Sequence, residues 1–274
     1  MSKKVLMAIL AHPDDETFGM GGTLALYARQ GVETILVCAT RGEAGEAEEK
    51  YLRGYSSMGE MREAELRGAA EKLGLKKLIF LNYRDSGMPG AVDNQHPQAL
   101  INAPDDELAA TFAALMREHG AQVVVTHDPI GGYGHPDHIK IHRAVKKAFA
   151  LAREQAGGPQ KLYFNTISRT ILRWVVRLMP LFGRDPRRYG QNQDIDLTRL
   201  AAEQTPVHAR INFSAVAEER KAASDCYASQ GGRKANEGMA GLLRGWARSH
   251  EVFMRAFPAP QPGVVEEDLF AGVA

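Results

Sequence analysis

The feature that most constrains the fold of this chain is a regular alternation of short apolar runs with segments of helical spacing. The apolar runs occupy residues 5–11, 33–39, 77–81 and 122–126. The first run lacks the polar alternation of a half-exposed strand, which indicates a strand buried on both faces. The helical segments occupy residues 17–30, 58–73, 104–119 and about 136–154. Four β-then-α units in succession predict an α/β fold with a mostly parallel sheet and right-handed crossovers.

The last third of the chain is less regular than the first two thirds. Residues 161–167 and 207–213 have the pattern of strands, and residues 215–229 and 242–256 the pattern of helices. We therefore expect residues 1–168 to form the catalytic core. Residues 169–274 would form an irregular α+β extension that completes the pocket, within the same domain or as a small subdomain.

The charge balance of the chain directs the search for a partner toward small molecules. The 274 residues carry 34 basic and 33 acidic side chains, a net charge of +1. This balance offers no general attraction to nucleic acid or to an anionic membrane. The two cysteines, Cys38 and Cys226, do not suggest a disulfide framework, and the first residues lack the apolar region of a signal peptide. We expect a cytoplasmic protein that acts on a small-molecule substrate.

One segment favours a different partner. Residues 171–179 combine Trp174 and aliphatic side chains with Arg173 and Arg177, as helices at a membrane interface do. No apolar run reaches the roughly 18 residues that a membrane-spanning helix needs. We expect the segment instead to pack over the pocket or against a second copy of the chain. The protein is therefore a candidate homo-oligomer without membrane association.

Residues that carry chemistry gather where the first strand ends. His12, Asp14, Asp15 and Glu16 place one imidazole and three carboxylates in a single turn. Unpaired, the carboxylates would repel one another, and a bound cation is the simplest partner that removes the repulsion. Taken alone, the same residues could form a capped turn and the acidic first turn of an exposed helix.

A second cluster follows the fourth strand, in Gly131-Gly132-Tyr133-Gly134-His135-Pro136-Asp137-His138. Because the carboxyl ends of parallel strands meet at one edge of a sheet, we expect both clusters to face the same site. Imidazole and carboxylate ligands without cysteine suit a catalytic Zn²⁺, which uses three protein ligands and leaves a fourth position to water. The metal lowers the pKa of that water to about 7, and a spare carboxylate can accept its proton. The residues alone do not decide among His135, His138 and His142 as ligands.

The two clusters together resemble the signature of the LmbE-like, or PIG-L, N-acetylglucosaminyl deacetylases. The resemblance rests on Ala11-His12-Pro13-Asp14-Asp15-Glu16 and on Gly134-His135-Pro136-Asp137-His138, and it extends to Arg62 and Tyr83-Arg84-Asp85-Ser86-Gly87-Met88. It covers most of the chain and implies a zinc hydrolase on a Rossmann-like fold. The chain is most similar to the branch that deacetylates GlcNAc-inositol or GlcNAc-malate. A thiol-conjugate amidase or a chito-oligosaccharide deacetylase is the alternative within the family.

The resemblance also implies which residues bind the metal and perform the reaction. Three residues would bind the zinc, namely His12, Asp15 and His138. Iron(II) is an alternative ion, since it accepts the same two-histidine, one-carboxylate face. Asp14 would be the general base. His135 would stabilise charge on the oxyanion or the leaving amine, and Tyr133 would polarise the amide carbonyl.

Further residues are implied to contact the substrate or to support the ligands. Arg62, Arg84 and Asp85 would hold substrate hydroxyls. Asp137 would orient an imidazole from behind the metal. Glu16 is left as a carboxylate at the helix entry or behind the ligands.

Two features depart from the family pattern and leave the identity of the substrate open. Tyr227 stands before Ala-Ser-Gln where a histidine is expected, and residues 168–193 have no close match. A nucleotide-binding Rossmann protein is the rival from another class, because Gly19-Met20-Gly21-Gly22 follows the first strand. That spacing is a poor dinucleotide fingerprint, and three carboxylates would repel a pyrophosphate. We therefore favour a zinc-dependent amidase that removes the acetyl group from an N-acetylglucosaminyl small molecule.

Overall fold

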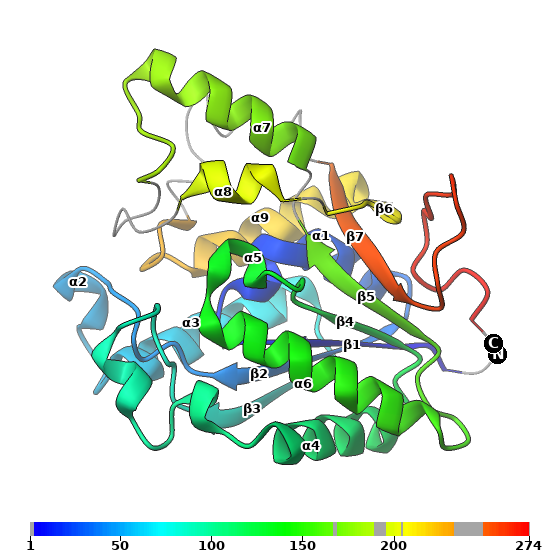
Figure 1. Cartoon of the computed structure of the whole chain (residues 1–274). Coiled ribbons are helices and arrows are strands. Elements are labelled where there is room, and N and C mark those ends of the chain that lie inside the picture. Colours follow the sequence, from blue (N-terminus) through cyan, green and yellow to red (C-terminus); the bar gives the residue numbers. More distant parts are fainter. Residues whose placement is uncertain (1–2, 167–168, 189–195, 204, 233–248, 274) are drawn as a thin grey trace.

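One sheet carries both clusters of the predicted site (Figure 1). A computed structural model describes residues 3–166, 169–188, 196–203, 205–232 and 249–273. Within these residues, seven strands form a sheet in the order β3-β2-β1-β4-β5-β7-β6. They are β1 (Val5–Leu10), β2 (Glu33–Thr40), β3 (Lys77–Tyr83), β4 (Val123–Thr126), β5 (Lys161–Thr166), β6 (Ala209–Asn212) and β7 (His250–Phe257). Strands β1 to β5 are parallel, whereas β7 is antiparallel to both of its neighbours.

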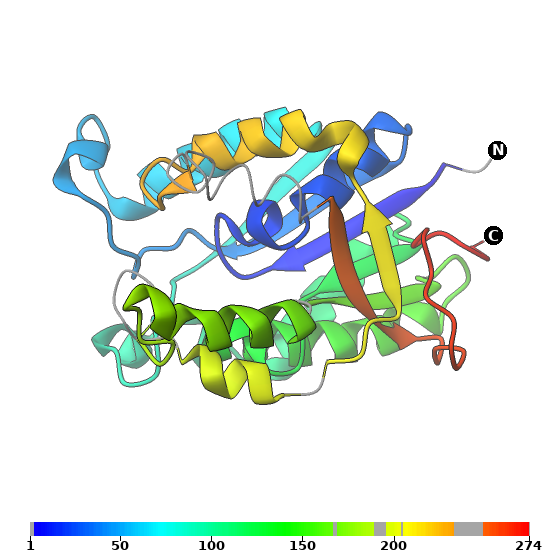
Figure 2. The same ribbon diagram turned by 90° about the horizontal axis from the view of Figure 1, so that it is seen from above.

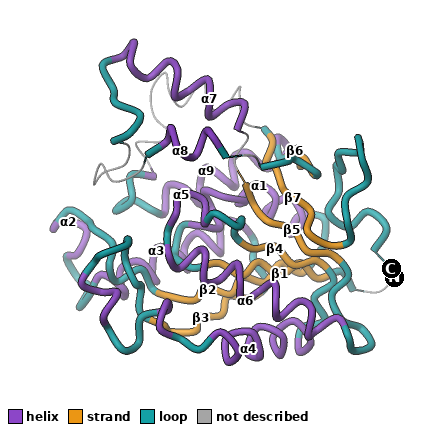
Figure 3. Tube along the Cα trace, viewed as in Figure 1, coloured by secondary structure: helices purple, strands orange, loops and turns teal. Residues whose placement is uncertain are grey.

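Helices connect most of these strands (Figure 3). The described residues contain α1 (Asp15–Arg29), α2 (Glu49–Leu52), α3 (Met58–Leu73), α4 (Asp105–Glu118), α5 (Gly131–Gly134), α6 (Pro136–Arg153), α7 (Arg169–Leu178), α8 (Leu197–Ala202) and α9 (Ala217–Cys226). The ends of α3 show why the sequence is helical there. The Ser57 hydroxyl accepts a hydrogen bond from the backbone N–H of Glu60, and Gly74 ends the helix in the left-handed conformation.

Two hydrophobic cores cover the two faces of the sheet. Alternation along β1 directs Leu6, Ala8 and Leu10 to one face, where they join the core formed with α1, α3 and α9. Met7 and Ile9 join the other core, with α4 and α6. Figure 2 shows the sheet between these two layers of helices. Every residue of β1 is buried, as expected of a central strand that is covered on both faces.

The predicted α/β fold class is confirmed, and the five parallel strands agree with the sequence within a few residues at their ends. Residues 41–57, between β2 and α3, contain one short helix, α2. The helix predicted over residues 242–256 is wrong, because His250–Phe257 form strand β7. Residues 242–248 lie outside the described part of the chain.

Glu251 explains why the sequence of β7 lacks the pattern of a buried strand. This side chain occupies an inward-facing, buried position, where a strand of this kind normally carries an apolar residue. Its carboxylate accepts hydrogen bonds from the backbone N–H groups of Gly22 at 2.9 Å and Thr23 at 2.6 Å. The buried charge therefore joins β7 to α1.

The glycine run of α1 is explained by packing. A Cβ atom on Gly22 would overlap the ring of Phe213, and one on Gly19 would overlap the side-chain amide of Asn165. Met20 lies between them with φ −152° and ψ 21°, so the helix is kinked at this point. The glycines allow β5 and the residue after β6 to approach α1, and no dinucleotide is needed to account for them.

The extension places α7 and α8 at the top of Figure 1, and α8 packs against both α7 and α5. Trp174, Leu181 and Phe182 are largely exposed in this region. Among the helices of the described residues, none is both long and apolar enough to cross a bilayer.

Both clusters lie at the point where the order of the strands reverses, between β1 and β4. Strand β1 lies between β2 and β4. In open α/β sheets, ligands bind at this point, beyond the carboxyl ends of the strands. His12 follows β1, and residues 127–138 follow β4, so the two segments lie at the same edge.

Candidate metal centre and active site

Three side chains from these two segments meet beyond the end of β1. His12 Nδ1 lies 3.1 Å from His138 Nε2, which in turn lies 3.2 Å from Asp15 Oδ1. His12 Nδ1 and Asp15 Oδ2 are 3.6 Å apart. The two histidines are 126 residues apart in the sequence, and the pairing of β1 with β4 brings them together.

In both histidines, the ring nitrogen that points away from this cluster makes a hydrogen bond, and this bond orients the ring. His138 Nδ1 lies 3.2 Å from the Gly131 carbonyl and donates to it, so Nε2 keeps a lone pair. His12 Nε2 lies 3.2 Å from Asp137 Oδ2 and donates to it, so Nδ1 keeps a lone pair. Asp137 is fully buried and also accepts a hydrogen bond from the Ser86 N–H at 2.9 Å. Metal-ligating histidines are oriented in this way by a carboxylate or a carbonyl.

These donors have the chemistry that a tetrahedral divalent cation requires. Bonds of about 2.0–2.1 Å at tetrahedral angles hold ligand atoms about 3.3 Å apart, and His12 Nδ1 and His138 Nε2 are 3.1 Å apart. Asp15 approaches His138 through Oδ1 and His12 through Oδ2. Without a cation, the approach of the two nitrogens requires a proton between them. The described residues contain three overlapping groups able to hold a metal: His12 with His135 and His138, Asp15 with His127 and His138, and His12 with Asp85 and Asp137. His12 and Asp15 thus each meet His138 in a separate group.

The surrounding charges shift the pKa values of Asp15 and His12 in opposite directions. Burial disfavours the charged form of Asp15, but the imidazoles of His138 and His127 outweigh burial and hold the pKa of this carboxyl well below its usual value. Burial also disfavours the charged form of His12, yet Asp85 and Asp137 lead the carboxylates that raise the pKa of its imidazole well above the ordinary value. The surroundings are thus rich in carboxylates and attract positive charge.

Asp14 stands beside the donor set, and none of the metal-binding groups found in the described residues includes it. Its carboxylate accepts a hydrogen bond from Arg62 Nη2 at 2.9 Å, and the same guanidinium donates to the Pro13 carbonyl. Burial raises the pKa of Asp14 to about 7, with Asp15 and Glu16 adding to the rise and Arg62 opposing it. A carboxyl group that titrates near neutrality can both accept and release a proton during a reaction.

His135 and Tyr133 belong to the turn that leads into α6. His135 caps this helix, because its Nδ1 accepts a hydrogen bond from the Asp137 N–H at 3.2 Å. Burial, with His12 and His138 close by, lowers the pKa of His135 to about 2, so the ring is neutral and its Nε2 carries the proton. The ring of Tyr133 lies edge-on to His138 at a centroid distance of 5.3 Å and is 39% exposed.

Glycine shapes this turn. Gly131, Gly132 and Gly134 all have positive φ values, which residues with a side chain rarely adopt. These three residues therefore let Tyr133 project beside the ligands while His135 begins the next helix.

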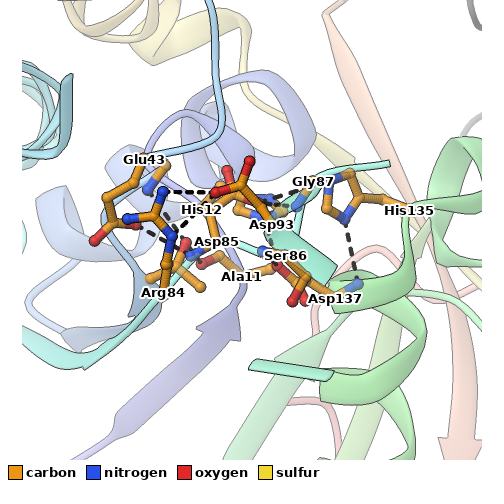
Figure 4. Close-up of polar contacts among 12 residues, drawn as sticks. Ala11, His12, Glu43, Arg84, Asp85, Ser86, Gly87, Asp93, His135 and Asp137 are labelled. Atoms are coloured by element: carbon orange, nitrogen blue, oxygen red, sulfur yellow. Dashed lines mark hydrogen bonds and ion pairs between the residues drawn. The ribbon is translucent and has the colours of Figure 1, made fainter. Parts of the chain in front are cut away.

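The loop after β3 is laid against the same site (Figure 4). Asp85 Oδ1 lies 3.4 Å from His12 Nε2 and 4.0 Å from His135 Nε2. Burial is outweighed by His12, which lowers the pKa of Asp85 below its usual value. The guanidinium of Arg84 instead bonds Asp93 Oδ1 through Nε at 3.0 Å and Nη2 at 2.6 Å. The structure thus brings Asp85 to the donor residues and pairs the Arg84 guanidinium with Asp93.

The structure also places His127 at the site, a residue that the sequence motifs do not include. Its ring stacks on His138 with centroids 3.9 Å apart, and its Nε2 accepts a hydrogen bond from the Ala11 N–H at 3.0 Å. Its position directly after β4, which matches that of His12 after β1, was the available signal. His142 donates from Nδ1 to the His127 carbonyl at 2.9 Å and packs on Phe164, so it lies behind the site.

Comparison with known proteins identifies the family. The family model described as PIG-L, GlcNAc-PI de-N-acetylase, matches residues 7–149, which include both clusters. The chain belongs to the PIG-L family. A relative from Thermobifida fusca is 38% identical over 244 residues, 84% of each chain. One from Salinispora arenicola is 33% identical over 98% of this chain and 91% of its own.

Both of these PIG-L relatives are named 1D-myo-inositol 2-acetamido-2-deoxy-alpha-D-glucopyranoside deacetylase. The resemblance stated from the sequence is therefore confirmed. So is the prediction of an enzyme, because this chain is a member of the de-N-acetylase class.

Solved structures share the fold of this PIG-L member. The N,N'-diacetylchitobiose deacetylase from Pyrococcus horikoshii has a TM-score of 0.54 at 20% identity, over 100% of this chain and 87% of its own. The 4-carboxy-2-hydroxymuconate hydratase from Pseudomonas putida has a TM-score of 0.60 at 18% identity, over 95% of this chain and 99% of its own. Because a deacetylase and a hydratase both match, the likeness shows the architecture alone.

Proposed function

We propose that this chain is a zinc-dependent hydrolase that removes the acetyl group from an N-acetylglucosaminyl small molecule of the GlcNAc-inositol type. The observation that carries the proposal is the convergence of donor atoms from His12, Asp15 and His138. His138 Nε2 lies 3.1 Å from His12 Nδ1 and 3.2 Å from Asp15 Oδ1, and His12 Nδ1 lies 3.6 Å from Asp15 Oδ2. Asp14 lies beside them as a carboxylate that the donor set does not use. The names of the two relatives support the substrate class.

The proposed reaction divides the work between a cation and an adjacent base. When bound by His12, Asp15 and His138, zinc supplies a Lewis acid that polarises the acetamide carbonyl and acidifies the attacking water. Asp14 accepts a proton from this water as its oxygen forms a bond to the carbonyl carbon. The C–N bond then breaks, the proton passes to the departing nitrogen, and acetate and the free amine are released.

Two further side chains are proposed to stabilise the negative charge that develops on the carbonyl oxygen. Tyr133 is 39% exposed and its ring lies beside His138, so we propose that its hydroxyl contacts the carbonyl oxygen of the substrate. Neutral His135 can donate from Nε2, since its Nδ1 accepts a hydrogen bond from the backbone. Donors aimed at a developing oxyanion commonly supply a large part of the rate enhancement.

Three residues were expected to bind substrate hydroxyls, and their contacts in the structure suggest different roles for them. Arg62 is buried against Asp14, so we propose that it orients the base. Asp85 and Arg84 remain the proposed hydroxyl contacts, since the Arg84 side chain is 36% exposed. We also propose that residues 169–274 serve the same site, because Tyr227 of this extension contacts Glu16.

An amine-release assay tests this function. Purified protein with measured zinc and iron content is incubated with GlcNAc-inositol, GlcNAc-malate and diacetylchitobiose, with and without a chelator. We expect free amine and acetate in equal amounts from GlcNAc-inositol, loss of the reaction after chelation, and its return on addition of zinc. Metal-loaded protein that releases no amine from any of the three compounds would contradict the proposal.

A further inference from the structure

The backbone of Asp14 adopts a conformation that has to be held. Its φ is 110° and its ψ is −27°, in the left-handed region that residues with a side chain rarely occupy. Aspartate tolerates the left-handed region better than most residues, yet the conformation remains costly. The contacts around this residue should therefore include one that offsets the strain.

Glu16 provides a contact to the strained backbone. Its Oε2 accepts a hydrogen bond from the Asp14 N–H at 3.1 Å. Glu16 is fully buried, and a carboxylate in such a place is expensive unless its oxygens are satisfied. Arg62 holds the other end of the same residue, because it bonds the Asp14 carboxylate. Asp14 is thus gripped at its backbone and at its side chain.

Tyr227 in turn holds Glu16. Its hydroxyl donates to Glu16 Oε1 at 2.7 Å, and Thr17 donates to the same oxygen. Tyr227 is fully buried and directly follows α9, which packs against both α1 and α3. Its ring lies 5.9 Å from that of Phe18. A side chain 211 residues away in the sequence therefore fixes the carboxylate beneath the proposed base.

We propose that Tyr227 and Glu16 are positioning residues that keep Asp14 in its left-handed conformation, so that its carboxylate is aimed at the attacking water. The inference rests on the proposed function, because it takes Asp14 as the base. Tyr227 acts through Glu16, and Glu16 acts through the Asp14 N–H. Loss of the tyrosine hydroxyl should therefore slow the chemical step while leaving the metal in place.

The chain offers a matched control for this hydroxyl. Tyr163 on β5 is also fully buried, and its hydroxyl donates to Glu266 Oε2 at 2.6 Å. This bond joins the sheet to the C-terminal segment. Tyr163→Phe and Tyr227→Phe thus each remove a tyrosine–glutamate hydrogen bond, which is part-buried at Tyr163 and buried at Tyr227.

The first measurement compares kcat, KM, bound zinc and thermal stability in the two variants. We expect Tyr227→Phe to lower kcat about tenfold, in the range seen when residues behind a metal site are removed, with KM and zinc content unchanged. Tyr163→Phe should also lower the melting temperature, because it removes a hydrogen bond, but it should change kcat less than about twofold, because the Tyr163 hydroxyl contacts Glu266 and not Glu16. Equal kcat losses in the two variants would overturn the proposal.

The second measurement needs no catalytic activity. Hydrogen–deuterium exchange read by fragmentation at the Asp14 amide should be slow in the wild type and in Tyr163→Phe, and faster in Tyr227→Phe. An unchanged exchange rate at Asp14 in Tyr227→Phe would overturn the positioning role. If the wild type released no amine from any substrate, the proposed function would fail, while the exchange rates would still decide whether Tyr227 holds Asp14.

Discussion

Asp14 and Asp15 are neighbours in the sequence with opposite surroundings. Asp15 faces three imidazoles, and those of His138 and His127 hold its pKa well below the usual value despite burial. Asp14 contacts the Arg62 guanidinium, and burial leaves its pKa at about 7. The left-handed turn at Asp14 sends the two carboxylates to different partners. One residue of chain therefore separates a group suited to hold a cation from a group suited to exchange a proton, a division known from other pairs of catalytic carboxylates.

The largest loss of activity should come from a substitution at Asp15. Asp15→Ala removes a charged donor from a set of three, so we expect loss of bound zinc and a fall in kcat of more than about a thousandfold. Metal analysis alongside the amine-release assay checks this. His142→Ala is the matched control and should keep its zinc. The ligand assignment is wrong if His142→Ala loses the metal while His138→Ala retains it.

A substitution at Asp14 should affect proton transfer without affecting metal binding. Asp14→Asn keeps the size of the side chain and removes its ability to accept a proton. We expect zinc content equal to that of the wild type and a fall in kcat of about a thousandfold, within the usual range for a general base. Full activity in this variant would remove Asp14 from the reaction, and loss of zinc would make it a ligand.

The pH profile should report Asp14 and not Asp15. A base works only when deprotonated, so activity should fall as pH decreases through the pKa of Asp14, about 7 before a cation is bound. A bound dication favours the carboxylate and moves the midpoint lower, so we expect kcat/KM to drop about tenfold per pH unit below a midpoint at or under about 7. A flat profile between pH 5 and 8, with zinc retained throughout, would count against the assignment.

Arg62 should set the position of that midpoint. Its positive charge opposes the rise in the pKa of Asp14, so Arg62→Gln should raise this pKa and move the acid limb to higher pH. A shift of about one pH unit is expected for loss of an adjacent opposite charge. Profiles of the variant and the wild type are compared at equal zinc content. A shift toward lower pH would show that another group controls the limb.

The sequence was sufficient to predict that the two clusters lie close together, because this prediction requires only that their strands belong to one parallel sheet. His12 and His138 follow strands that are visible as apolar runs, and adjacent strands of this topology end at one edge. The element that failed was β7. Glu251 fills an inward position there and bonds to α1, so the strand carries a charge where its pattern requires an apolar side chain.

The contacts that tune the site were beyond sequence analysis. The left-handed backbone of Asp14 follows from tertiary contacts, since Asp-Asp-Glu is equally compatible with an ordinary first helical turn. The hydrogen bond from Tyr227 to Glu16 joins residues 211 positions apart, and no local pattern encodes it. His127 is intermediate, because its place after β4 was visible but its stacking on His138 was not.

The separation of 126 positions between His12 and His138 has a consequence for how the protein is made. A nascent chain emerging from the ribosome presents His12, Asp14 and Asp15 long before the second imidazole exists. A cation could be held firmly only after β4 had been synthesised and had paired with β1. Because such an ion would bind the completed sheet and not the unfolded chain, it would add to stability according to its concentration. Metal content would then report which molecules in a preparation have finished folding.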